Sequence, residues 1–243
     1  MNLVIDIGNT LQKVAVFDRD GKLLHHLVVE KVEVMLLEKI LAKFPIQRSI
    51  VSSVAESAED VQTYLQLHTS FLPFSANVSL PIKLLYESPQ TLGLDRIANA
   101  VGAAALFPNE NLLALQAGTC LVADFVDCDG NFRGGTISPG LTMRFRALHE
   151  FTQRLPLESR GEIDTIMGNT TKSSIQVGVI QGFVYEIEGI INAFSRQYPH
   201  LKVLLTGGDL SYLQKSIKNM IFAAPNLVLW GLNKILDFNG KEM

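Results

Sequence analysis

The sequence predicts an α/β fold in which one arrangement of strands and helices occurs twice along the chain. The first observation is a small polar turn between two apolar strands, at residues 6–10 and again at residues 116–119. The second is an Asp-Gly turn after each of these strand pairs, at residues 18–21 and 127–130, which is a sequence signal for a β-hairpin. Both halves are therefore expected to begin with three antiparallel strands.

In the first half, apolar runs bounded by turn residues predict strands at residues 2–6, 12–17 and 22–29. Apolar residues at helical spacing predict a helix over residues 34–44, which Pro45 ends. The remaining elements expected in this half are a short buried strand at 49–54, a helix at 61–67, a strand at 82–86 and an Ala-rich helix at 93–107.

The second half repeats the opening with strands at residues 112–115, 120–126 and 131–137. A helix is expected to start at Pro139 and Gly140 and to run to about residue 152. The remaining elements are a long helix at 171–197 with an apolar stripe, a buried strand at 202–206, a short helix, a strand around 226–229 and a closing helix from Leu232.

Three antiparallel strands followed by alternating helices and strands, occurring twice, resemble the ribonuclease H fold. We therefore expect an α/β protein with two ribonuclease-H-like lobes, each with a mixed five-stranded sheet. No Pro/Ser-rich linker separates the halves, so the lobes are placed at residues 1–110 and 111–243.

Composition and charge argue against some classes of function for this chain. The chain has 243 residues, of which 47% are hydrophobic and 19% charged, so it can form a substantial core. The net charge of -3 argues against a dedicated nucleic-acid binder. The apolar runs are too short to span a bilayer, and the N-terminus lacks the pattern of a signal peptide. The two cysteines, Cys120 and Cys128, fit neither a metal-ligand spacing nor a disulfide framework. A cytoplasmic protein without membrane or nucleic-acid partners is expected.

The first polar turn has the chemistry of a phosphate loop. Gly8 lets backbone N–H groups approach phosphate oxygens, and Asn9 and Thr10 add side-chain donors. Lys13 could reach the phosphates as a positive charge, and Asp6 at the end of a strand could hold Mg²⁺. Taken alone, the same residues would also suit a plain hairpin turn with a solvated Asp.

Two later segments extend this pattern. Gly118 and Thr119 form a second turn of the same kind, and Gly207-Gly208-Asp209 follows a late buried strand. The three segments, in this order, resemble the two phosphate elements and the adenosine element of the acetate kinase, sugar kinase, Hsp70 and actin superfamily. The resemblance implies an ATP cleft between the two lobes.

Three further runs, at residues 89–100, 134–140 and 168–171, point to one family within this superfamily. They are similar to the Gly-x-Asp-Arg and Gly-Gly-x-Ile-x-Pro-Gly signatures of type III pantothenate kinases, and the similarity covers essentially the whole chain. The resemblance implies phosphorylation of pantothenate by ATP with Mg²⁺, the first step of coenzyme A biosynthesis, by a homodimer. The apolar stripe at 171–197 could be a dimer contact or core. Sugar and acetate kinases have larger insertions than 243 residues allow.

The same resemblance assigns residues to roles. Asp95 is implied as the general base, and a carboxylate in the first turn of a helix is favoured by the helix dipole. On their own, Asp95 and Arg96 would also suit a helix N-cap beside a surface arginine. The implied ATP contacts are Asp6, Ile7, Gly8, Asn9, Thr10, Leu11, Gln12, Lys13 and Thr119, and the implied pantothenate contacts are Tyr86, Gly93, Leu94, Asp95, Arg96 and Thr171, with Thr170 as the alternative to Thr171.

One position departs from the family pattern. Where the family has an Asp that binds an activating monovalent cation, usually potassium, this chain has Gln116. The amide can coordinate K⁺ or NH₄⁺ but brings no charge. Three outcomes are open: weaker cation binding, no cation requirement, or weakened catalysis with a regulatory, accessory-factor-like role. Asp124 on the next strand remains available for a metal-bound water or a structural hydrogen bond.

Overall fold

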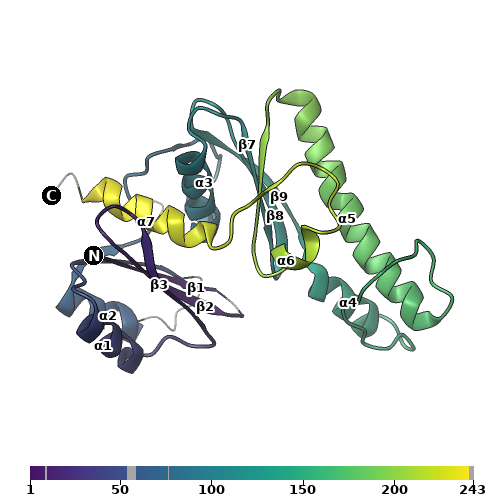
Figure 1. Cartoon of the computed structure of the whole chain (residues 1–243), viewed down its shortest axis with the longest axis horizontal. Coiled ribbons are helices and arrows are strands. Elements are labelled where there is room, and N and C mark those ends of the chain that lie inside the picture. Colours follow the sequence, from purple (N-terminus) through teal and green to yellow (C-terminus); the bar gives the residue numbers. More distant parts are fainter. Residues whose placement is uncertain (9, 54–58, 76, 241–243) are drawn as a thin grey trace. The chain divides into compact units, whose positions relative to one another are not determined.

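The computed structural model describes residues 1–8, 10–53, 59–75 and 77–240, which form two compact units (Figure 1). The first unit contains Met1–Asn109, Cys128–Arg133 and Asn226–Met243, and the second contains Glu110–Asp127 and Gly134–Pro225. The chain therefore returns to the first unit twice after leaving it. The lobe boundary at 110/111 stays a prediction.

The first unit is built on a sheet of five described strands in the order β3-β2-β1-β4-β5. β1 is antiparallel to β2 and parallel to β4, so the sheet is mixed, as expected. The elements of this unit are β1 (Asn2–Ile7), β2 (Gln12–Phe17), β3 (Leu23–Val29), α1 (Val34–Lys43), β4 (Arg48–Ser53), α2 (Glu59–His68), β5 (Ser70–Pro73), β6 (Lys83–Leu84), a 3₁₀ helix (Pro89–Thr91), α3 (Leu94–Leu106) and α7 (Leu227–Asn239).

Alternation along β1 gives the sheet two different faces. Leu3, Ile5 and Ile7 join a buried core with α1 and α2. Asn2 points the other way and donates to Asn233 of α7 at 2.8 Å. Because side chains alternate between the faces of a strand, Asp6 lies on the α7 face with Asn2. The Asp6 carboxylate is thus on the side of β1 that carries Asn2, not in the apolar core with α1 and α2.

Helices α3 and α7 pack so closely that glycine is required where they meet. A Cβ at Gly231 would lie 1.7 Å from the carbonyl oxygen of Ala98, and one at Gly102 would lie 2.7 Å from the carbonyl oxygen of Leu227. The strand predicted around residues 226–229 is wrong, because this segment begins α7. Its apolar run resembles a buried strand only because this end of the helix is buried on all sides.

The second sheet has the order β11-β10-β7-β8-β9-β6 among the described residues, so the expected five strands become six. The extra strand is β6, which pairs with the first residues of β9 through Lys83↔Asn131 and Leu84↔Phe132. The remaining elements are β7 (Leu112–Ala117), β8 (Cys120–Val126), β9 (Asn131–Pro139), α4 (Leu141–Glu150), α5 (Thr171–Gln197), β10 (Lys202–Thr206), α6 (Leu210–Leu213) and β11 (Phe222–Ala223).

The apolar stripe of α5 is core. Ile175, Ile180, Val184 and Ile187 are buried in one cluster with β7, β8, β10 and α4. Of the two roles left open for this stripe, packing within the unit is the one that the structure shows.

Most other predicted elements are confirmed, with shifted ends. The strand predicted at 82–86 shortens to Lys83–Leu84, and the strand β5 was not predicted. The predicted strand at 49–54 ends at Ser53, and Val54 lies outside the described residues.

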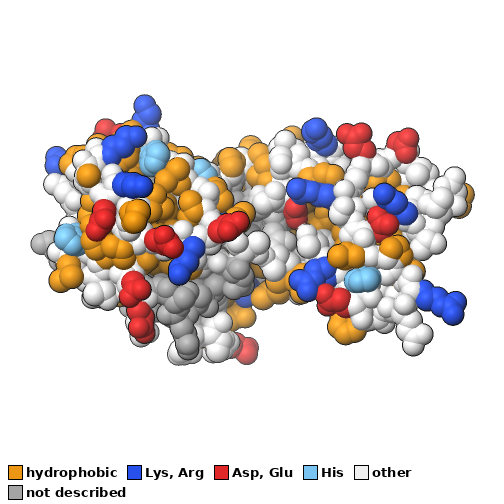
Figure 2. Space-filling view, turned by 90° about the horizontal axis from the view of Figure 1, so that it is seen from below, with side chains coloured by type: hydrophobic (Ala, Val, Ile, Leu, Met, Phe, Trp, Pro, Cys, Tyr) orange, Lys and Arg blue, Asp and Glu red, His pale blue; other side chains and the backbone are white. Residues whose placement is uncertain are grey.

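The charged side chains on the surface are of both signs, in line with the small net charge of -3. In Figure 2, Lys and Arg side chains are interspersed with Asp and Glu on the face in view. Within the described part of the chain, no helix combines the length and apolar character needed to cross a membrane.

Candidate functional site

Three polar side chains lie side by side across the first sheet. Asp6 on β1 is the register partner of Lys13 on β2 and of Ser52 on β4. Register partners on neighbouring strands project from the same face of a sheet, here the face that also carries Asn2 and α7. Lys13, Asp6 and Ser52 are called the polar row below.

The β1–β2 hairpin continues from this row and is the predicted phosphate loop. A Cβ at Gly8 would lie 3.1 Å from the carbonyl oxygen of Leu11, so a larger residue would crowd the turn. Thr10 and Leu11 are exposed. Asn9, predicted as an ATP contact, lies outside the described residues.

Two other residues predicted to contact ATP hold the hairpin in place with their side chains. Ile7 is buried in the core with α1 and α2. The Gln12 side-chain oxygen accepts a hydrogen bond from the Val32 backbone N–H at 2.6 Å. Their side chains therefore anchor the loop, and backbone groups are what these residues can offer to a phosphate.

The carboxyl of Asp6 is electrostatically perturbed. Burial raises the pKa of Asp6 from 3.8 to about 6, the Lys13 ammonium lowers it, and the carboxylate of Asp95 raises it further. The two carboxylates are thus close enough to interact, although they are 89 positions apart in sequence. A buried carboxylate that ionises with difficulty beside a second carboxylate is a favourable place for a cation.

Asp95 lies in the first turn of α3, which begins at Leu94 with Gly93 as its N-cap. A Cβ at Gly93 would lie 2.7 Å from Oδ1 of Asp95, so the Asp95 carboxylate occupies the space that any larger side chain would need. Because Gly93 is the N-cap, Asp95 is not a capping residue. The alternative interpretation of Asp95 as a helix cap is therefore wrong.

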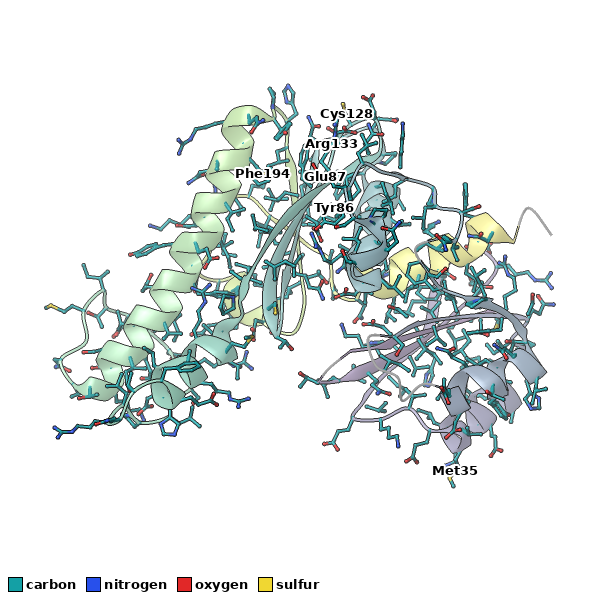
Figure 3. The ribbon with its side chains drawn as sticks, turned by 180° about the vertical axis from the view of Figure 1, so that it is seen from behind. Met35, Tyr86, Glu87, Cys128, Arg133 and Phe194 are labelled. Atoms are coloured by element: carbon teal, nitrogen blue, oxygen red, sulfur yellow. The ribbon has the colours of Figure 1, made fainter. Side chains whose placement is uncertain are left out.

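Arg96 is buried, with 7% of its surface exposed, so it is not the surface arginine of that alternative. Its guanidinium carbon lies 5.8 Å from the ring centroid of Tyr86 and 5.8 Å from that of Phe132. The two rings meet edge to face, 5.9 Å apart. Figure 3 shows Tyr86 next to Glu87 and Arg133 in this part of the unit. The predicted pantothenate contacts Tyr86 and Arg96 are thereby brought together.

In the second unit, three glycine-containing segments meet at the β7–β8 hairpin. The N–H of Gly140 donates to the carbonyl of Thr119 at 3.0 Å, and a Cβ at Gly140 would lie 2.1 Å from the carbonyl oxygen of Gly118. Gly207 has φ +101°, and a Cβ there would lie 2.1 Å from the carbonyl oxygen of Ala117. The predicted second phosphate element, the start of α4 and the predicted adenosine element therefore share one location.

A pocket of about 500 Å³ opens beside these segments. Arg160 donates to Asp209 at 2.8 Å at its edge, and the Arg160 guanidinium lies 5.5 Å from the ring centroid of Tyr212. Burial raises the pKa of Asp209, and Arg160 opposes this. The lining residues are Leu141, Thr142, Phe145, Arg146, Leu157, Glu158, Ser159, Arg160 and Asp209.

Gln116 is half-buried on β7, in register with Val122 on β8 and Thr206 on β10. Asp124 on β8 is buried, and a Cβ at Gly135 would lie 2.7 Å from its Oδ1. Asp124 is therefore enclosed by the neighbouring strand.

The structure distinguishes the two threonines before α5. Thr170 is the N-cap: its side chain accepts from the Ser173 N–H at 3.1 Å, and the Ser173 hydroxyl accepts from the Thr170 N–H at 3.0 Å. This capping box occupies Thr170. Both threonines are exposed, but the Thr171 side chain takes no part in the capping box, and the choice of Thr171 as the ligand contact stays a prediction.

The predicted site residues thus form two groups. Within the first unit the structure brings together Asp6, Lys13 and Asp95, and separately Tyr86 and Arg96. Within the second it brings Thr119 to the glycine segments. The sequence interpretation missed Ser52 and the pocket beside Asp209. Ser52 could have been found by pairing the predicted strand at 49–54 with that at 2–6.

Comparisons with known proteins identify a family for the chain. Residues 2–193 match the family model for type III pantothenate kinase. The chain is 40% identical over 243 residues to a type III pantothenate kinase of Phocaeicola vulgatus, covering 99% of this chain and 100% of the relative. It is 44% identical over 242 residues to one of Bacteroides fragilis, covering 98% of each. Among solved structures, a Baf family transcriptional activator from Campylobacter jejuni superposes with a TM-score of 0.60 at 20% identity, covering 98% of this chain and 99% of that one.

Proposed function

The chain belongs to the type III pantothenate kinase family, and we propose that it transfers the γ-phosphoryl group of ATP to pantothenate. The product is 4′-phosphopantothenate, and the step is the first of coenzyme A biosynthesis. The observation that carries the proposal is the close approach of Asp6 and Asp95, two carboxylates suited to a cation and to a reacting hydroxyl.

Asp95 is the proposed general base. Phosphoryl transfer passes through a loose transition state, so the base mainly orients the primary hydroxyl of pantothenate and takes its proton late. Arg96, which lies against the ring pair of Tyr86 and Phe132, offers a fixed positive charge to the carboxylate of pantothenate. Tyr86 and Thr171 are the proposed neutral contacts.

Asp6 fits Mg²⁺ in the manner of nucleotide-dependent enzymes. This ion binds through one or two carboxylates together with waters and substrate phosphates. No cluster of three or more His, Cys, Asp or Glu side chains suited to a metal occurs among the described residues. A Mg²⁺ site in which Asp6 supplies the one protein carboxylate and ATP oxygens and waters supply the other ligands therefore agrees with the residues present. When bound, the ion neutralises phosphate charge, while Lys13 and the hairpin backbone hold the phosphates.

The pocket beside Asp209 is the proposed place for the nucleoside. It adjoins Thr119, the predicted second ATP contact, through Leu141 and Gly140. Its apolar residues, such as Leu157 and Phe145, suit a base, and its polar rim suits a ribose.

Activation by K⁺ or NH₄⁺ is proposed to be weak in this chain. Gln116 contributes an amide oxygen but no charge, so a monovalent cation gains less there than beside a carboxylate. The protein is proposed to work in the cytoplasm.

A homodimer is also proposed. Large apolar side chains are exposed on the second unit, including Phe151 at 86%, Ile166 at 83% and Met167 at 77%. Apolar groups this exposed are typical of a contact with another chain, here a second copy. Because the stripe on α5 is core, these residues are the proposed contact.

A coupled assay of ADP release with pantothenate and Mg·ATP, with and without potassium, tests the activity. We expect pantothenate-dependent turnover that Asp95→Asn reduces by about two orders of magnitude or more. Absence of turnover at high ATP, or unchanged turnover in Asp95→Asn, contradicts the proposal. The regulatory alternative is not favoured, because the relatives at about 40% identity are named as kinases.

A further inference from the structure

Ser52 carries a buried hydroxyl for which the described residues offer no hydrogen-bond partner. The residue is 1% exposed. It ends the polar row beside Asp6, at the carboxyl end of β4. Leaving a buried polar atom without a partner costs about 1–3 kcal/mol, so native proteins rarely keep one without a reason.

A second serine on the same strand shows the ordinary case. Ser49 is 0% exposed, and its Oγ pairs with the Thr69 Oγ1 at 2.5 Å. Three positions separate the two serines, so they point to opposite faces of the sheet. Ser49 faces the apolar core with its partner, whereas Ser52 faces the side that carries Asp6 and Lys13.

The side chains of Ser52 and Asp6 project from register partners on adjacent strands and are therefore close to each other. Neighbouring strands lie about 4.8 Å apart, and side chains of register partners project in parallel. Rotation about χ1 of either side chain brings the hydroxyl within hydrogen-bond distance of a carboxylate oxygen. A hydroxyl can donate to an ionised carboxylate, and such charge-assisted bonds are roughly twice as strong as neutral ones.

We propose that Ser52 is a positioning residue for Asp6, with its hydroxyl donating to one carboxylate oxygen when Mg²⁺ and the nucleotide engage the other. The polar row then holds the carboxylate from both sides, with the Lys13 ammonium on β2 and the Ser52 hydroxyl on β4. This role rests on the proposed function, because it assumes that Asp6 serves a metal–nucleotide complex.

The test compares Ser52→Ala with Ser49→Ala and Ser52→Thr. Urea unfolding without ligands reports structural roles, and calorimetry with Mg²⁺ and a non-hydrolysable ATP analogue reports positioning. We expect Ser52→Ala to be as stable as the wild type or more so, and to bind the Mg²⁺–analogue complex about tenfold more weakly. Its half-saturating Mg²⁺ concentration should rise in parallel, and Ser52→Thr, which keeps the hydroxyl, should restore binding.

Ser49→Ala is expected to show the reverse, a lower urea midpoint of unfolding with unchanged binding of the analogue. If Ser52→Ala loses stability as Ser49→Ala does and binds the analogue like the wild type, Ser52 has only a structural role and the proposal is overturned. Binding is measured without pantothenate, so a wild type that binds the analogue but does not phosphorylate pantothenate contradicts the proposed function and leaves this comparison valid.

Discussion

Replacing Asp6 by asparagine is expected to stabilise the ligand-free protein while abolishing phosphoryl transfer. Burial raises the pKa of Asp6 from 3.8 to about 6, so the carboxyl ionises less readily in the folded protein than in the unfolded chain. Asparagine has nearly the same shape and carries no charge. It therefore avoids this cost, and it also removes the ligand proposed for Mg²⁺.

The gain in the free energy of unfolding expected for Asp6→Asn follows from the raised pKa of Asp6. At about 1.4 kcal/mol per pH unit, the difference between 3.8 and about 6 corresponds to roughly 3 kcal/mol. Because the folded state holds the proton more tightly, stability is highest where Asp6 is protonated and falls as pH rises from about 4 to about 6. The advantage of Asp6→Asn should thus grow from about 1.5 kcal/mol at pH 5 to about 3 kcal/mol at pH 8. Since Asp6 keeps part of its surface exposed, these values are upper bounds.

Urea unfolding in the presence of a metal chelator, at pH 5, 6.5 and 8, measures this difference. Asp20→Asn, which removes a carboxylate from an exposed turn, controls for the change in net charge and should stay within about 0.5 kcal/mol of the wild type. An Asp6→Asn protein no more stable than the wild type at pH 8, or a gain of equal size at pH 5 and pH 8, would refute the reasoning. The same variant should release no ADP above background in the coupled assay.

Three further predictions concern other parts of the molecule. Gln116→Asp is expected to make turnover more dependent on potassium, seen as a larger ratio of rates with and without the ion, and an unchanged ratio contradicts the cation assignment. Gly231→Ala should lower the free energy of unfolding by about 3 kcal/mol, because its Cβ would lie 1.7 Å from the Ala98 carbonyl oxygen; a neutral result would mean that α3 and α7 can move apart. Thr170→Ala should cost about 1 kcal/mol of stability with little change in the KM for pantothenate, whereas Thr171→Ala should raise that KM with little change in stability, and the opposite pattern would exchange their roles.

Local pattern was enough to predict most of the fold. Apolar runs next to Asp-Gly turns locate β2 and β8, a buried run before Gly207 locates β10, and an apolar stripe at helical spacing locates α5. The start of α7 could not be found in this way. Its residues Leu227, Val228 and Leu229 are all buried, so no polar face reveals the helical period.

Candidate site residues can be named from the sequence where the motif residues are contiguous, but not where they come together through pairing between strands. Asp95 and Arg96 follow from a local run of residues. Ser52 lies beside Asp6 only through the register of their strands, and that register is set by the parallel pairing of β1 with β4 across the intervening hairpin and α1. The burial of Arg96 depends similarly on Phe132, which lies 36 positions further along the chain.

The return of the C-terminal helix to the first unit has a consequence for synthesis on the ribosome. Asn2 bonds to Asn233 and Asp237 of α7 at 2.8 Å each, and Arg48 bonds to Asp237 at 2.6 Å, so β1 and β4 are tied to a helix that is translated much later. The second unit, which ends at Pro225, is fully translated before any residue of α7 exists. We therefore expect the second unit to acquire its structure first, while β1, with Asp6 on it, becomes ordered only after α7 has been translated. Contacts between such distant parts of a sequence form slowly, so a nascent or truncated protein that lacks α7 should expose the sheet face that carries the polar row.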